Sequence, residues 1–351
     1  MIDLRSDTVT KPTEEMRKRN GPKQKLETTY MEKTHLLTFS KKKTAAPARK
    51  EAGLLMASGT MSNLVAILAH CDRGDEVIMG DQAHIFWNES GGASGLAGVQ
   101  IRLISNGDQG QINPDELASS IRPKGNIHTA PGTLVCLENT HNRCSGGVLT
   151  PSQTAEIANI AHSADAKVHL DGARLFNAAI ALEVPVTELT KDVDDVSFCL
   201  SKALSCPVGS VLCGSKEFIQ EALRWRKMVG GGMRQAGVLA AAGLVALDNM
   251  IDRLADDHAN ARQLAAGIAN IKGLSVDPET ISTNIVIFDI DPSVGPAAEV
   301  INALKEQDVL VSSPGPSSIR MVTHRHITGS DIEKALAATS KVVDTLGSNS
   351  K

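Results

Sequence analysis

The chain has 351 residues, of which 42% are hydrophobic, so it can bury a large core, and its length predicts about two or three domains. A formal net charge of −4 argues against nucleic acids and anionic membranes, which attract basic surfaces, and leaves small molecules as the expected partners. No stretch reaches the roughly 18 apolar residues that cross a bilayer, and Met1–Asp7 lacks the features of a signal peptide, so we expect a cytoplasmic protein without a membrane partner.

The six cysteines show neither a C-x-x-C pair nor a zinc-binding spacing, which predicts reduced thiols and no metal site. Aromatic residues make up only 3% of the chain, and Tyr30 is the single tyrosine, so we expect an aliphatic core without platforms for stacking bases. The cysteines are Cys71, Cys136, Cys144, Cys199, Cys206 and Cys213.

Residues 21–50 differ from the rest of the chain in charge and pattern. They contain eight Lys and Arg against two acidic residues, so the segment carries +6 and the remainder −10. Neither the 3.6-residue period of a helix nor the two-residue period of a strand runs through them. Composition alone predicts a solvated loop.

From about residue 52 onward, apolar strand-like runs alternate with helical patterns, which predicts an α/β domain with a mainly parallel sheet. Between the strands lies the helical stretch Thr150–Ser163, with Thr150 as N-cap and Pro151 at the first helical position. The expected strands are continuous apolar runs, typical of a sheet covered on both faces. They are Glu76–Met79, Ile101–Ile104, Leu134–Leu137, Lys167–Leu170, Val196–Leu200 and Ser210–Cys213.

Further along, a glycine-rich break at 230–232 separates two expected helices, and a third leads out of the large domain; they are Ser215–Met228, Met233–Asn249 and Asp252–Ile271. The pattern then predicts a small C-terminal α+β domain made of strand Asn284–Asp289, helix Pro296–Glu306, strand Ile319–Val322 and a helix from Ser330. We expect an N-terminal arm with the atypical basic segment at 1–50, a large domain at 51–250 and a small domain at 251–351.

Two strand ends carry the main functional hypothesis. Asp171 follows the run His169-Leu170, and Lys202 follows Val196–Leu200, so both are expected at the carboxyl edge of the sheet, where ligands bind. A pyridoxal-phosphate site needs such a pair: a lysine that forms a Schiff base with the cofactor and a carboxylate that keeps its pyridine nitrogen protonated. Lysine suits the role because its amine can lose its proton when desolvated. Either residue alone would be an ordinary surface residue.

The stretch Ala57–Asn63 is the candidate phosphate site. A glycine turn before the helical run Leu64–His70 presents backbone N–H groups and the positive end of a helix dipole to an anion. The hydroxyls of Ser58 and Thr60, on either side of Gly59, add further donors. An ordinary serine or threonine helix cap is the alternative interpretation.

Several motifs make the chain resemble the low-specificity L-threonine aldolases, which are fold-type I pyridoxal enzymes. The resemblance covers residues 1–19 and about 50–345, and it implies an aspartate-aminotransferase-like α/β fold, pyridoxal 5′-phosphate as cofactor and an amino acid as substrate. The family also contains alanine racemases and β-eliminating enzymes. The motifs are Met1-Ile-Asp-Leu-Arg-Ser-Asp-Thr-Val-Thr, Ala57-Ser-Gly-Thr-Met, Gln82-Ala-His-Ile-Phe, Leu137-Glu-Asn-Thr-His-Asn, His169-Leu-Asp-Gly-Ala-Arg, Phe198-Cys-Leu-Ser-Lys and Gly230-Gly-Gly-Met-Arg-Gln-Ala.

Carried over by motif, the resemblance implies that Lys202 binds the cofactor covalently, that Asp171 pairs with its pyridine nitrogen and that His84 stacks on its ring. Arg174 is expected to bind the ring oxygen or to tune the Schiff base. Arg234 is either a phosphate contact or an interface contact. The remaining expected cofactor contacts are Ser58, Gly59, Thr60 and Ser201.

The resemblance also implies a grip on the substrate. Ser6 and Arg320 are expected to bind its carboxylate, since the planar guanidinium binds a carboxylate through two hydrogen bonds; a surface ion pair is the alternative for Arg320. His128 matches a position that contacts the substrate hydroxyl, and a surface or core histidine is its alternative. Glu138 either lines the pocket floor or serves the fold alone.

The implied reaction is retro-aldol cleavage of L-threonine or L-allo-threonine to glycine and acetaldehyde, with the electrons of the Cα–Cβ bond passing into the pyridinium ring held by Asp171. An alanine racemase, which exchanges the α-proton instead, or another enzyme of the same family remains an alternative. A catalytically impaired relative is a further one. Because sites in this fold are built between two chains, we expect a homodimer or a homotetramer.

Residues 20–49 depart from the family, which carries a stretch such as Glu-Val-Gly-Asp-Asp-Val-Tyr-Gly-Glu-Asp-Pro where this chain has Lys25-Leu-Glu-Thr-Thr-Tyr-Met-Glu-Lys-Thr-His. With suitable synonymous codons, the family stretch read one base later encodes the observed residues as far as Thr34. We therefore hypothesise that residues 20–49 are translated out of frame, with Tyr30 matching the family's tyrosine only by accident. Such a segment would alter both the substrate pocket and the contact between subunits.

Sequencing the transcript across codons 18–52 tests this hypothesis. We expect a compensating pair of frameshifts or a misplaced exon boundary, with family-like sequence resuming near Lys50. An intact reading frame that is shared by close relatives would rule the hypothesis out.

Overall fold

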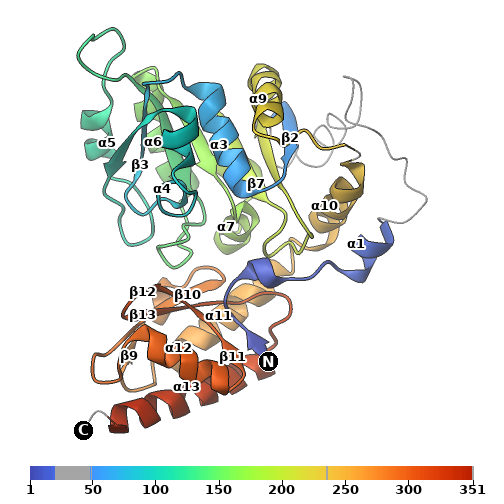
Figure 1. Ribbon diagram of the computed structural model, residues 1–351, viewed down its shortest axis with the longest axis vertical. Helices are drawn as coiled ribbons and strands as arrows, with labels where there is room; N and C mark the ends of the chain where they lie inside the picture. Colours follow the sequence, from blue (N-terminus) through green and yellow to red (C-terminus); the bar gives the residue numbers. More distant parts are fainter. Residues whose placement is uncertain (20–47, 49, 235, 350–351) are drawn as a thin grey trace.

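A computed structural model describes residues 1–19, 48, 50–234 and 236–349. Apart from Ala48, the predictions about residues 20–49, including the out-of-frame hypothesis and Tyr30, lie outside the described residues. Figure 1 shows the polypeptide in two parts, a sheet flanked by helices above and a smaller group of strands and helices below, with the N-terminus beside the lower part.

The upper part contains a seven-stranded sheet in the order β2-β8-β7-β6-β5-β3-β4. Only β8 runs against its neighbours β2 and β7; the pairs from β7 to β4 are parallel, as the alternating pattern predicts. All six predicted strands are present, and β2 is an addition that its short apolar run did not identify, because such a run also fits a buried helix. The strands are β2 (Ala52–Met56), β3 (Glu76–Gly80), β4 (Gln100–Ile104), β5 (Gly132–Glu138), β6 (Lys167–Asp171), β7 (Asp195–Cys199) and β8 (Ser210–Gly214).

Both faces of this sheet are buried, which explains the continuous apolar strands. On one face, residues such as Ile78, Val168 and Phe198 pack in a hydrophobic cluster with α5, α6, α7, α8 and α10. On the other, residues such as Val77 and Leu212 pack against α3 and α9. The helices are α3 (Gly59–His70), α4 (His84–Trp87), α5 (Pro114–Ser120), α6 (Pro151–Ser163), α7 (Leu175–Leu182), α8 (Val186–Thr190), α9 (Lys216–Met228) and α10 (Gly237–Asn249).

Local signals place several of these helices where the sequence predicts them. Thr150 caps α6 in a reciprocal capping box with Gln153, and Pro151 occupies the first turn. Ser215 caps α9 through a hydrogen bond from the backbone N–H of Phe218. The helix expected from Met233 begins only at Gly237.

The lower part is built on a four-stranded antiparallel sheet in the order β12-β13-β10-β9, covered by three helices whose buried residues form a separate hydrophobic cluster. The two strands and three helices expected in this region are present, although α11 is shorter than predicted. The division of the chain at residues 50 and 250 stays a prediction. The elements are β9 (Leu274–Ser275), β10 (Ile285–Ile290), β12 (Ser312–Gly315), β13 (Ser318–Val322), α11 (Leu254–Ile268), α12 (Ala297–Glu306) and α13 (Gly329–Asn349).

The N-terminal segment joins this lower part. β1 (Ile2–Asp3) pairs in parallel with β11 (Val309–Leu310), and Leu4 is buried in the same cluster as the helices α11 to α13. Beyond β1, the segment crosses to the upper part, where α1 (Glu14–Arg19) lies beside α10. The first residues of the chain therefore run along the junction of the two parts. Among the described helices, none is both long and apolar enough to cross a membrane.

Candidate active site

The predicted strand-end pair lies at one edge of the sheet. β6 and β7 are parallel neighbours in which Asp171 is level with Ser197, so Asp171 ends β6 and Lys202 follows the end of β7. Both charges reach the thiol of Cys199. Burial raises the pKa of that thiol, the ammonium of Lys202 lowers it and the carboxylate of Asp171 raises it. The two residues therefore both lie near Cys199, at the end of β7.

Asp171 is buried, and each of its carboxylate oxygens accepts a hydrogen bond. Asn63 on α3 donates from Nδ2 to Oδ2 over 2.8 Å, and the backbone N–H of Ala173 donates to Oδ1 over 3.1 Å. The side chain is therefore held in one orientation at the end of β6. A carboxylate fixed in this way can accept a further hydrogen bond from a protonated ring nitrogen.

His84 begins α4, directly after the turn that follows β3, and its ring is tied to acidic neighbours. Nδ1 lies 2.8 Å from Oε1 of Glu89, and the backbone N–H of His84 donates to Oε2 of Glu138 over 2.7 Å. Burial lowers the pKa of His84, but the hydrogen bond to Glu89 and the charges of Asp171 and Glu138 outweigh it, so the net shift is upward. Glu138 therefore does position a predicted site residue.

One atom each from His84, Glu89 and Asp171 could serve as a metal ligand, and these atoms lie within 4.8 Å of one another. Glu89 and Asp171 already accept hydrogen bonds from the amide of Asn63, and His84 is hydrogen-bonded to Glu89. The arrangement is therefore accounted for by hydrogen bonds between these side chains.

The amino end of α3 approaches the same edge of the sheet. A Cβ atom on Gly59 would lie 2.9 Å from Sγ of Cys199, so only glycine lets the helix start so close to β7. The Ser58 hydroxyl accepts from the backbone N–H of Met61, as in the alternative reading of an ordinary N-cap, while Thr60 is exposed. The first turn of α3 contains no acidic residue. This end of the helix therefore fits a phosphate group.

Asp7, next to the predicted Ser6, is a site residue that the sequence analysis missed. Its buried carboxylate accepts two hydrogen bonds of 2.7 Å from Nε and Nη2 of Arg174. Burial raises the pKa of Asp7, but Arg174, Lys202 and Arg320 together hold it far below its usual range. Nη1 of Arg174 donates to Oδ1 of Asn142 over 3.5 Å, so the predicted contact with the cofactor would use the remaining N–H bonds of Nη1 and Nη2.

Arg320 on β13 brings the lower part of the molecule into the site. Its Nη2 donates to Oδ1 of Asn142 over 2.9 Å and its Nη1 donates to the carbonyl oxygen of Arg5 over 3.3 Å, but its buried Nε has no acceptor among the described residues. Burial and the neighbouring Arg174 lower its pKa to about 10, although Asp7 opposes the shift. A buried guanidinium with one N–H bond that lacks an acceptor fits the carboxylate of an amino acid.

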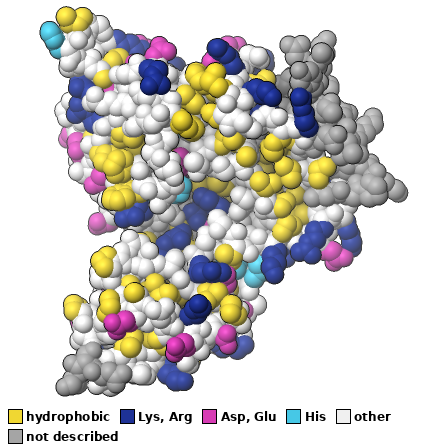
Figure 2. All heavy atoms as spheres, viewed as in Figure 1, with side chains coloured by type: hydrophobic (Ala, Val, Ile, Leu, Met, Phe, Trp, Pro, Cys, Tyr) yellow, Lys and Arg dark blue, Asp and Glu magenta, His cyan; other side chains and the backbone are white. Residues whose placement is uncertain are grey.

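The other predicted residues are placed less directly. The Ser6 hydroxyl accepts from the backbone and side chain of Thr8, Ser201 is half-buried beside Lys202, and Arg234 is exposed in the loop between α9 and α10. Figure 2 shows Lys and Arg side chains gathered where the upper and lower parts meet.

His128 does not join the site within one chain. It is exposed and lies four positions before Gly132, the first residue of β5, whereas Glu138 at the other end of this strand faces the site. Seven residues of β strand extend over about 20 Å, so His128 lies at the opposite edge of the sheet. The predicted contact with substrate therefore stays a prediction, and it would need a second copy of the chain.

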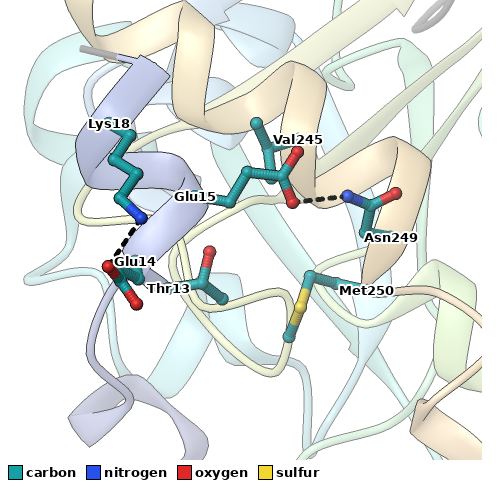
Figure 3. A pocket seen from close by; sticks show the side chains of 7 residues that line it. All are labelled: Thr13, Glu14, Glu15, Lys18, Val245, Asn249 and Met250. Carbon is teal, nitrogen blue, oxygen red and sulfur yellow. Dashed lines mark hydrogen bonds and ion pairs between the residues drawn. The ribbon is translucent and has the colours of Figure 1, made fainter. Parts of the chain in front are cut away.

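Cavities in the described parts of the chain lie both beside the site and away from it. One, of about 340 Å³, lies beside α3 and includes Thr60 and Glu89, so it borders the site. Another, of about 460 Å³, lies between α1 and α10 (Figure 3) and contains none of the predicted residues. Its polar side chains pair with each other, Lys18 with Glu14 over 2.7 Å and Asn249 with Glu15 over 2.8 Å, and so offer no reactive group.

The fold and this edge of the sheet define a fold-type I enzyme that depends on pyridoxal phosphate. The threonine aldolase of Leishmania major has a similar fold, with a TM-score of 0.79, 16% identity and coverage of 98% of this chain and all (100%) of that one.

The family model described as beta-eliminating lyase matches residues 3–291, and the chain belongs to this family of pyridoxal-phosphate-dependent lyases. It is 43% identical to the probable low-specificity L-threonine aldolase 2 of Arabidopsis thaliana, over 97% of both chains. It is 37% identical to the low specificity L-threonine aldolase of Escherichia coli K12, over 96% of this chain and 98% of the relative.

The pair between Asp7 and Arg174 predicts the stability of an Asp7→Asn variant. The variant should lose about 3 to 5 kcal/mol of unfolding free energy at pH 7, because a buried guanidinium is left without its counter-charge. Since folding lowers the pKa of Asp7, its stabilisation is complete above the unfolded pKa of about 4 and is lost as the pH falls below it. Urea unfolding of the apo protein between pH 8 and pH 3 measures both effects.

Asp3→Asn is the matched control for this prediction. Asp3 pairs with the exposed Arg5 over 2.7 Å, and such a pair contributes less than about 1 kcal/mol. Equal losses in the two variants would contradict a special role for Asp7.

Proposed function

We propose that the protein cleaves L-threonine and L-allo-threonine to glycine and acetaldehyde. The observation that carries the proposal is that three elements converge at one edge of the sheet. Asp171 ends β6 beside β7, which leads to Lys202, and Arg320 on β13 donates to Asn142, whose backbone N–H donates to Glu138 at the end of β5. The names of the relatives from Arabidopsis thaliana and Escherichia coli support the choice of substrate. We also propose that the protein is cytoplasmic and forms a homodimer or homotetramer, in which a second copy could bring His128 to the site.

The described residues offer partners for the aldehyde group, the ring and the phosphate group of pyridoxal phosphate. Lys202 would hold it covalently, Asp171 would accept a hydrogen bond from its ring nitrogen, and His84 would stack on its ring. The amino end of α3, from Ser58 to Thr60, would bind the phosphate. When bound, the cofactor supplies an electron sink for the pair of electrons released as the Cα–Cβ bond breaks.

The protein side chains orient the substrate. The Nε–H of Arg320 is a free donor for the substrate carboxylate, and Ser6 lies on the neighbouring N-terminal segment as a second contact. Fixing the carboxylate limits rotation about the bonds to Cα, so that the bond to be broken can be held perpendicular to the cofactor ring. Asp7 holds Arg174 beside the same space through two hydrogen bonds. Among the described residues, Asp7 accepts no hydrogen bond from Arg320, so Arg320 stays available for the substrate.

The reaction also moves two protons. The β-hydroxyl group must lose its proton as it becomes the carbonyl group of acetaldehyde, and Cα must gain a proton to give glycine. His84 would make the first transfer through Nε2, because its Nδ1 is bound to Glu89. Its raised pKa, caused by the acidic neighbours that overcome burial, favours holding that proton once it is taken.

Loss of the lysine tests the core of the proposal. Lys202→Ala should abolish the visible absorbance of covalently bound cofactor and lower acetaldehyde release from L-threonine by about a thousandfold or more. Lys50→Met is the matched control, because Lys50 is also largely buried but donates to the carbonyl oxygen of Val193 at the opposite edge of the sheet. The purified protein is assayed with and without added pyridoxal phosphate.

Product analysis of the purified protein with L-threonine and with L-alanine separates the alternatives. Conversion of L-alanine to D-alanine without acetaldehyde release from L-threonine would favour the racemase. Cofactor absorbance without either activity would favour an impaired enzyme and would indicate residues 20–49 as the cause.

The carboxylate contact predicts a second variant. Arg320→Lys should raise KM for L-threonine by about tenfold or more and leave cofactor binding unchanged, because a lysine cannot make two parallel hydrogen bonds to a carboxylate. Steady-state kinetics and absorbance titration measure the two effects. Arg325→Lys is the control, since Arg325 donates to the carbonyl oxygen of Lys11. An unchanged KM in Arg320→Lys would refute the contact.

A further inference from the structure

A layer of polar side chains crosses the buried face of the sheet beneath α3. On β6, His169 and Asp171 alternate with the core residues Val168 and Leu170; on β7, the polar residues are likewise at alternate positions. Successive side chains of a strand point to opposite faces, so these polar groups share the α3 face. Buried polar groups must find partners, and here they find them in one another and in α3. The β7 members are Asp195 and Ser197.

Asn63 on α3 is the centre of this layer. Its Nδ2 lies 2.8 Å from Oδ2 of Asp171 and 2.8 Å from Oε1 of Glu89, and the same Glu89 oxygen lies 2.8 Å from Nδ1 of His84. One fully buried amide therefore touches Asp171 and, through Glu89, the ring of His84. These are the two side chains proposed to contact the nitrogen and the face of the cofactor ring.

The direction of this amide is fixed by its partners. Carboxylates accept hydrogen bonds, so both N–H bonds of Nδ2 are used on Asp171 and Glu89. Oδ1 then faces Nε2 of His169 over 3.0 Å and the hydroxyl of Ser197 over 3.2 Å, and both must donate to it. A reversed amide would set oxygen against two carboxylates.

The imidazole of His169 carries a proton on each nitrogen by the same reasoning. Nε2 donates to Asn63, and Nδ1 lies 2.5 Å from Oδ1 of Asp195, whose other oxygen lies 2.7 Å from Nε2 of His70. Burial lowers the pKa of His169, but Asp195, Asp171 and Glu89 raise it more. On the neighbouring strand β5, the thiol of Cys136 is level with His169, and burial keeps this thiol neutral.

We propose that Asn63 is a positioning residue that sets Asp171 and, through Glu89, His84 in place for the pyridoxal ring, and that the ion pair of His169 with Asp195 fixes the direction of its amide. The inference rests on the proposed cofactor contacts of Asp171 and His84. Asn63 itself touches neither substrate nor cofactor in this arrangement. Its effect is to couple two side chains that come from the end of β6 and the start of α4.

Asn63→Asp tests the proposal with almost no change of shape. The new carboxylate can still accept from His169 and Ser197, but it sets an oxygen against Asp171 and Glu89 in place of the two donors. The affinity of the apo protein for pyridoxal phosphate should fall by about ten- to a hundredfold at pH 8. The difference in cofactor affinity between the wild type and the variant should become smaller as the pH is lowered, because a proton shared between the carboxylates replaces the lost donors. Absorbance titration across this pH range gives the affinities.

Asn177→Asp is the matched control. Asn177 is also a buried asparagine bonded to a buried histidine, with Nδ2 3.1 Å from Nε2 of His258, but it has no contact with Asp171 or Glu89. It should leave cofactor affinity and its pH dependence unchanged. Wild-type affinity in Asn63→Asp, or the same loss in Asn177→Asp, would overturn the proposal.

A second measurement does not require a variant of Asn63 to fold. In the ¹⁵N NMR spectrum of the apo protein at pH 7, His169 should show protons on both ring nitrogens, with its signals assigned by their absence in His169→Gln. An unprotonated Nε2 would reverse the amide of Asn63 and overturn the proposal. If the cofactor absorbance that depends on Lys202 is present while these results fail, only the role of Asn63 is refuted; if that absorbance is absent, the proposed function fails instead.

Discussion

The buried ion pair between Asp7 and Arg174 is the contact on which the geometry of the candidate site depends. Removing two charges from water costs several kcal/mol per ion, and only well-placed hydrogen bonds offset that cost. The pair meets this condition with two hydrogen bonds, and Asn284 on the segment before β10 donates a third to Asp7 over 3.2 Å. The N-terminal segment is therefore held between the sheet edge and the lower part of the molecule.

That segment also sets the distance between the two halves of the site. Leu4 donates to the carbonyl oxygen of Leu310 and accepts from the backbone N–H of Val322, two residues beyond Arg320. A few residues later, the hydroxyl of Thr10 donates to the carbonyl oxygen of Lys202 over 2.9 Å. A single short stretch thus binds the strand that carries the proposed carboxylate contact and the loop that carries the proposed cofactor lysine. Any displacement of it would move both.

The sequence predicted much of the fold because its strands are buried on both faces. Continuous apolar runs with a polar residue at the carboxyl end identified β6 and β7 and placed Asp171 and Lys202 correctly at one edge. Capping signals did the same for α6. Among the strands longer than two residues, β2 and β12 were missed. The apolar run of β2 also fits a buried helix, and β12 has the sequence Ser-Ser-Pro-Gly, which is typical of a turn. Motif resemblance placed His128 near the substrate, but no local pattern indicates which edge of the sheet a loop will occupy.

The residues that sequence reasoning missed at the site, Asp7 and Asn63, share a cause. Each acquires its role from a partner more than a hundred positions away, Arg174 in one case and Asp171 in the other. A signal for the second was nevertheless present, because β6 carries histidine and aspartate at alternate positions of a strand that otherwise reads as core. In a sheet covered on both faces, such residues cannot reach water and must meet polar partners on the covering helix. The pattern of β6 therefore predicts that α3 must offer a hydrogen-bond donor. Which residue of α3 supplies it is determined by how α3 packs against β6 and β7, and this packing selects Asn63.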